Sequence, residues 1–175
     1  MWGEFVGLFS KLFSKNKKSE PAPKERDVFT IKVGDIVTYD LVDYEVVGKI
    51  TYRSGNYEWY SYQLLEGKNT VWLAAEMDDE LELGIYNKIT FPVSKPFPKE
   101  LSHEGKTYYF DESGMARIIG EGRSANLQGS EVEYAEYVDE DEEGSISLEV
   151  WGSEVEVSVG YPIESYEIKI MAGSL

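Results

Sequence analysis

Carboxylates are the commonest side chains here that could do acid–base or metal chemistry. The 175 residues include 33 Asp and Glu, one His and no Cys. The lone His103 excludes a histidine-based metal cluster, and the lack of Cys excludes thiolate ligands and disulfides. The acidic run 139–143 lacks the spaced ligands of a calcium loop, so we expect a solvated hairpin tip. Because context distinguishes none of the acids, we expect no enzyme, no metal and no cofactor.

Aromatic side chains in the first half of the chain are the second group that could bind a ligand. They could line a groove for a peptide, a glycan or a polyamine, and an acidic aromatic cleft would suit a cation. The other interpretation is that they are core and cross-strand pairs. The candidate groove residues are Tyr57, Trp59, Tyr60, Tyr62 and Trp72.

These aromatic residues lie in a region of strand-like runs separated by turns. Between Val33 and Leu73, β-branched and aromatic residues alternate with polar ones, and Gly-containing turns interrupt them. Farther on, the runs 131–138 and 145–151 flank the acidic tip, and 153–159 alternates Glu and Ser with Val, with one face buried and one wet. A last strand is expected over 166–170. The pattern predicts an all-β protein with small SH3-like or curled-sheet barrels.

The strand pattern of the first half returns in the second. The segment 34–48 is echoed by 105–120, a Tyr-rich strand follows in each half, and Trp72 corresponds to Trp151. Three prolines between 92 and 98 mark a boundary. We therefore predict two related β units, 30–95 and 96–175, although generic hairpins also resemble one another. One continuous sheet and two separate barrels both remain open.

The first 18 residues predict an amphipathic helix, followed by a flexible linker over 19–29. The segment is too short to span a bilayer and lacks the features of a signal peptide. We expect it to contact the inner face of the cytoplasmic membrane or a partner protein; docking on the β body and a frayed tail are the alternatives. The contact residues would be Trp2, Phe5, Val6, Phe9, Leu12 and Phe13, with Lys11, Lys15, Lys17 and Lys18 near anionic headgroups.

Charge is distributed unevenly along the chain. The formal net charge is −16, yet residues 1–26 carry six Lys or Arg against three Glu. The body would repel phosphates, so nucleic-acid binding is not expected. A cytoplasmic protein fits the lack of Cys.

The motifs from Val33 to Gly48, the run Trp59-Tyr60-Ser61-Tyr62-Gln63-Leu64, and Gly105-Lys106-Thr107-Tyr108 with Leu148-Glu149-Val150-Trp151 resemble the bacterial Domain of Unknown Function 4178 family. The resemblance covers roughly residues 31–171. It implies a cytoplasmic β protein with no assigned activity or catalytic residues. It also implies genes that often neighbour those of phage-shock-like envelope-stress proteins, small membrane proteins and a spermidine-synthase-like enzyme.

Two functions follow as hypotheses. The first is a non-enzymatic adaptor at the cytoplasmic membrane surface, which presents its acidic body to a protein partner in an envelope-stress system. The alternative is a module that binds a small cationic metabolite, or an enzyme accessory protein, using the aromatic first half. The sequence does not indicate an oligomeric state.

Overall fold

The computed structural model describes residues 26–174 and contains a single antiparallel β-sheet. Apart from strands, this part of the chain has two single-turn 3-10 helices, Ala125–Leu127 and Ser165–Glu167. The strands are β1 (Ile36–Tyr39), β2 (Val42–Ser54), β3 (Tyr57–Glu66), β4 (Asn69–Met77), β5 (Leu81–Ile89), β6 (Glu100–His103), β7 (Lys106–Gly122), β8 (Glu131–Val138), β9 (Ser145–Trp151), β10 (Glu154–Ile163) and β11 (Ile168–Met171). The predicted all-β class is confirmed.

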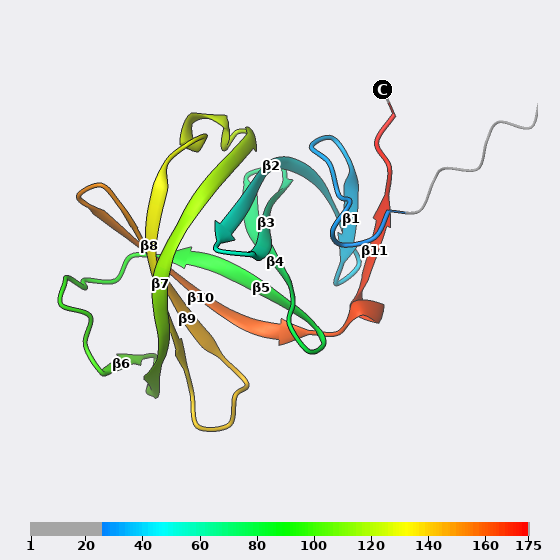
Figure 1. The fold of residues 1–175 in the computed structure, drawn as a ribbon. Coiled ribbons are helices and arrows are strands. Elements are labelled where there is room, and N and C mark those ends of the chain that lie inside the picture. The colour runs from blue at the N-terminus through cyan, green and yellow to red at the C-terminus, as the bar shows by residue number, and fades with distance from the viewer. Residues whose placement is uncertain (1–25, 175) are drawn as a thin grey trace, which may run out of the picture.

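Eight of the strands close into a barrel. The sheet order is β11-β1-β2-β3-β4-β5-β10-β9-β8-β7-β6, and a further pairing of β2 with β7 closes the ring. That pairing runs from Gly48 opposite Gly122 to Arg53 opposite Arg117. The strands β1 and β11 extend the sheet on one side of the barrel, and β6 extends it on the other (Figure 1).

The prediction of two small SH3-like or curled-sheet units is not confirmed. Each half does contribute a four-stranded meander, β2 to β5 and β7 to β10, preceded by a short strand. The two meanders share two seams, β2 with β7 and β5 with β10, so neither has a barrel of its own. Closing one large ring leaves fewer sheet edges than two open units would.

The apolar faces of most barrel strands point outward. Leu64, Leu73 and Ile85 pack under residues 28–31, β1 and β11 in a first core. Tyr137, Ile146 and other outward residues of β8 to β10 pack under the segment 89–101 in a second core. Both cores therefore lie between the barrel wall and the chain that covers it, so the opposite face of these strands is free to line the interior.

A third cluster lies at the β2–β7 seam. Ile50, Tyr52 and Ile118 are buried there, with Trp59 and Trp151 packed against them. The ring of Tyr52 stacks on Trp59 with centroids 5.2 Å apart. This cluster fills part of the interior with aromatic side chains.

The predicted helix over residues 1–18 lies outside the described residues, as does most of the predicted linker. The described contacts with the β body include residues before the expected start at residue 30. The Arg26 side chain forms an ion pair with Asp35 at 2.7 Å, and Val28 is buried in the first core. The hydroxyl of Tyr62 donates to the Val28 carbonyl at 2.6 Å.

The carboxylate of Asp35 ties both ends of the described chain to the barrel. It is 3 % exposed and accepts hydrogen bonds from the backbone N–H of Lys32 at 2.8 Å and of Gly173 at 2.9 Å, besides its pair with Arg26. These contacts hold the segments that cover the first core.

We expect Asp35→Ala to destabilise the fold by about 3–5 kcal/mol, because it leaves a guanidinium and two N–H groups without their acceptor. Denaturant unfolding monitored by tryptophan fluorescence measures the change. The exposed Glu45→Ala on β2 is the control, with an expected change within about 0.5 kcal/mol. Equal stability of the two variants would contradict the assigned role of Asp35.

Candidate functional site

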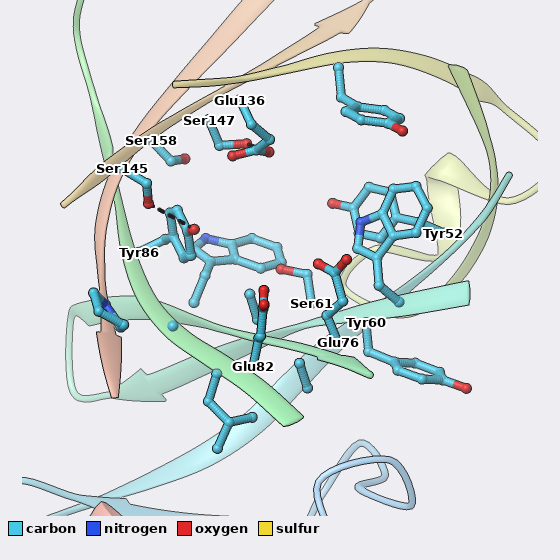
Figure 2. A pocket seen from close by; sticks show the side chains of 18 of the residues that line it. Tyr52, Tyr60, Ser61, Glu76, Glu82, Tyr86, Glu136, Ser145, Ser147 and Ser158 are labelled. Atoms are coloured by element: carbon cyan, nitrogen blue, oxygen red, sulfur yellow. Dashed lines mark hydrogen bonds between the residues drawn. The ribbon is translucent and has the colours of Figure 1, made fainter. Parts of the chain in front are cut away.

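The interior of the barrel contains a cavity of about 780 Å³. All eight barrel strands contribute to its lining, and most of the labelled side chains converge on a common space (Figure 2). An eight-stranded barrel is about the size that holds one small ligand, and this volume lies within the range of small-molecule sites. We call this space the lumen.

The lumen is strongly acidic. Its described lining includes one basic side chain, Lys88, against eleven acidic ones. The acids are Glu76, Asp78, Glu80, Glu82, Asp111, Glu112, Glu136, Glu142, Glu149, Glu156 and Glu164. Because β10 ends beside the first residues of β5 and β9, the acidic β4–β5 and β8–β9 turns lie at the same end of the barrel. Acids thus occur both inside the lumen and at that end.

Lys88 is neutralised by contacts within the barrel. Its ammonium is 3.0 Å from a Glu156 carboxylate oxygen and 5.0 Å from the ring centroid of Trp72. A primary ammonium in this lumen thus contacts a carboxylate and an aromatic face together, which is the usual geometry of a cation–π site.

Two glutamates lie deep in the barrel wall with different hydrogen bonds. Glu149 accepts from the Tyr52 hydroxyl on Oε1 at 2.7 Å and from the Trp151 indole on Oε2 at 3.1 Å. Glu136 accepts from the Ser147 hydroxyl on Oε1 at 2.8 Å. Its Oε2 has no hydrogen-bond partner among the described residues, and the carboxylate points into the lumen (Figure 2).

The surroundings of these glutamates disfavour their charged forms. Burial, reinforced by nearby Glu149, Glu112 and Glu76, raises the pKa of Glu136 to about 8, although its hydrogen bond from Ser147 acts in the opposite direction. Burial also raises the pKa of Glu149 and, at the acidic end, of Glu82.

Aromatic rings form the other part of the lining. Trp59 stacks on Tyr52 and meets Tyr134 edge to face at 5.3 Å. The Tyr86 hydroxyl lies 2.9 Å from the Ser145 hydroxyl. A Cβ on Gly160 would lie 2.5 Å from the Tyr86 ring, so this ring needs glycine on the neighbouring strand. The lumen offers carboxylates, hydroxyls and aromatic faces to one ligand.

The structure brings together three of the five candidate groove residues. Tyr57, Trp59 and Trp72 line the lumen. Tyr62 lies on the outer face of β3 in the first core. Tyr60 borders the cavity, but its ring packs on Phe29 and Tyr62 and points away from the other labelled side chains (Figure 2).

Other sequence candidates lie elsewhere. His103 packs edge to face against Phe91, 6.0 Å between ring centroids, outside the lumen lining. In the acidic run, residues 140–143 are exposed as expected of a hairpin tip, whereas Asp139 is buried and accepts from the Glu143 N–H. The ten N-terminal contact residues between Trp2 and Lys18 lie outside the described residues.

Sequence reasoning missed the lumen glutamates and serines. Their signal is the alternation on three consecutive strands, where Glu136 lies opposite Ser147 and Ser147 lies opposite Ser158. The strand pattern alone predicts a solvated polar face, because closure of the sheet is not visible in it. The same alternation describes a polar barrel interior.

A family model described as "Domain of unknown function (DUF4178)" matches residues 32–165. The chain belongs to this family. The predicted family membership is therefore confirmed, and the matched region contains all the barrel strands.

Similar proteins are described as uncharacterised. They occur in Mycobacterium bovis and in two strains of Mycobacterium tuberculosis, and each is 28% identical over 144 residues, which cover 78% of this chain and 69% of the relative. No solved structure matches the chain. Within residues 26–174 there is no helix long and apolar enough to cross a membrane.

We expect Glu136→Gln to flatten the pH dependence of stability. Between its ordinary pKa of 4.5 and its folded value of about 8, Glu136 keeps its proton in the folded state and loses it on unfolding. Stability therefore falls as pH rises through this window, by up to about 1.4 kcal/mol per pH unit. Gln has no proton to lose, so the stability of the variant should increase relative to that of the wild type as the pH rises toward 8.

Denaturant unfolding from pH 5 to 8.5 measures this effect. The control is Glu133→Gln, which makes the same change on the outer face of β8, where Glu133 pairs with Lys95. Stability curves of wild type and Glu136→Gln that run parallel would show that Glu136 has an ordinary pKa in the fold.

Proposed function

We propose that the barrel binds a small organic cation in its lumen. The observation that supports this proposal best is the barrel cavity, whose lining has eleven acidic residues and one lysine, and that lysine is already paired with Glu156. These carboxylates do not contribute to the two larger apolar cores, because those cores lie outside the barrel wall.

Electrostatics favour a positively charged occupant. Buried carboxylates are costly unless they are paired, and Glu136 and Glu149 also repel each other when both are ionised. A bound cation would interact favourably with Glu136, Glu149 and Glu76 at once. It would therefore stabilise the folded state by an amount that increases with its affinity and its concentration.

The aromatic walls favour an organic cation over a metal ion. Tyr52, Trp59 and Tyr134 supply ring faces and edges beside the carboxylates, which suits an ammonium with an apolar body. Among residues 26–174, no group of three or more His, Asp or Glu is arranged to hold a metal ion.

A thermal-shift experiment with ligands that share one body tests the proposal. We expect 2-phenylethylamine, its N,N,N-trimethyl analogue, or both to raise the melting temperature of the full chain. Neutral 2-phenylethanol and anionic 3-phenylpropionate should not. A ligand at 100 times its dissociation constant adds about 2.7 kcal/mol, or roughly 5–10 °C for a chain of this size.

The double variant Glu136→Gln/Glu149→Gln should lose this shift, whereas Glu133→Gln should keep it. A shift with the neutral alcohol equal to that with the cations would show that the lumen selects for shape alone. The absence of any shift with both cations up to millimolar concentration would refute the proposal for this ligand class.

The membrane adaptor suggested by the sequence is a separate proposal, which rests on the spacing of Trp2, Phe5 and Phe9 and on the basic flank up to Lys18. In this proposal, the N-terminal segment brings the barrel to the membrane surface and to a protein partner, in an envelope-stress setting.

Co-sedimentation with vesicles tests the tether. We expect the full chain to bind vesicles that contain anionic phospholipid, more weakly at high salt because basic residues contribute. A chain that begins at Arg26 should stay in the supernatant. Equal sedimentation of both forms would contradict a tether in residues 1–18.

A further inference from the structure

The lumen has two chemically different regions. On one side, the carboxylate of Glu136 and the hydroxyls of Ser145, Ser147 and Ser158 face the cavity (Figure 2). The second region contains the stacked rings of Tyr52 and Trp59, where the Tyr52 hydroxyl donates to Glu149. A ligand that fills both regions must combine a hydrogen-bonding head with an apolar body.

We infer that the lumen selects a primary ammonium group on an apolar or aromatic body, and that Glu136 is the carboxylate that receives this ammonium. The inference rests on the proposed function, because it assigns a ligand class and a specificity residue to the same site.

Hydrogen bonding distinguishes Glu136 from Glu149. Both oxygens of Glu149 already accept, from Tyr52 and from Trp151. Among the described residues, Oε2 of Glu136 accepts from none, and its carboxylate points into the lumen. A ligand N–H can therefore reach Glu136 without breaking a bond within the protein.

The register of the strands places two serines in the same row of the barrel wall as Glu136. Glu136, Ser147, Ser158 and Lys88 lie opposite one another in turn across β8, β9, β10 and β5. The Lys88 ammonium is engaged by Glu156 and Trp72. The row thus contains a carboxylate and two serine hydroxyls, which suit the three N–H donors of a primary ammonium.

A quaternary ammonium lacks these donors. In this position it would remove water from the Glu136 oxygen and the serine hydroxyls without replacing the lost hydrogen bonds. The Lys88 ammonium shows that a primary ammonium can meet a carboxylate and a ring in this lumen. Hydrogen bonding should therefore decide between the two kinds of cation.

Protonation of Glu136 supplies an independent readout. The charged groups around it are Glu149 on β9, Glu112 on β7 and Glu76 on β4, with the ion pair of Lys88 and Glu156 farther along the wall. Because Glu136 is mostly protonated near pH 7, binding of an ammonium should ionise it and release a proton. Affinity for a primary amine should then rise from pH 6 to pH 8.

Titration calorimetry of the full chain at pH 7 tests the inference, in two buffers of different ionisation enthalpy. We expect 2-phenylethylamine to bind at least tenfold more tightly than its N,N,N-trimethyl analogue and to release between half a proton and one proton. Glu136→Gln should weaken amine binding at least tenfold and abolish the release. Glu133→Gln should change neither.

The outcomes separate the two proposals. If the trimethyl analogue binds as tightly as the amine, or if Glu136→Gln binds the amine normally, the inference is wrong while cation binding stands. If neither cation binds the wild type, cation binding in the lumen fails and the inference fails with it. Proton release is measured on the wild type, so the test does not depend on the variant alone.

Discussion

The structure depends on where each strand presents its apolar face. In β3, β4, β5, β8, β9 and β10 the apolar side chains point outward, where residues 28–31, β1, β11 and the segment 89–101 cover them. The barrel wall is therefore stabilised from outside, through cores that do not occupy its interior. Asp35 contributes to this arrangement because it joins Arg26 and Gly173 to β1 and so holds part of the cover in place. The cluster at the β2–β7 seam, by contrast, fills part of the interior.

The interior is therefore polar, and its glutamates make it acidic. Serines alone would make a wet cavity, but Glu136, Glu149 and Glu76 interact unfavourably when all are ionised, and burial raises the pKa of the first two. The fold thus accommodates an electrostatic cost inside a barrel whose hydrophobic stabilisation comes from elsewhere. Sites that depart from the general rules of packing are commonly functional ones. This reasoning connects the outward cores to the proposal that a cation occupies the lumen.

Local patterns in the sequence predicted the strands well and their closure poorly. Alternation and the acidic turn placed β8 and β9 at 131–138 and 145–151, as found, because a half-buried antiparallel strand repeats every two residues. Because side chains alternate between the two faces of a strand, Tyr60 and Tyr62 cannot share a face with Trp59. The five candidate groove residues therefore could not all line one groove. Whether a polar face meets solvent or a lumen depends on the distant seam of β2 with β7, and no local pattern encodes that seam. The lumen glutamates were missed for this reason.

A crystal structure of the full chain with bound 2-phenylethylamine is the most direct test of the account. The account predicts electron density for the amine inside the barrel, with its nitrogen within about 3 Å of the free Glu136 oxygen and its ring against the wall formed by Tyr52 and Trp59. Density for the amine only on the outer surface, or an interior filled by rearranged side chains, would contradict a cation site in the lumen.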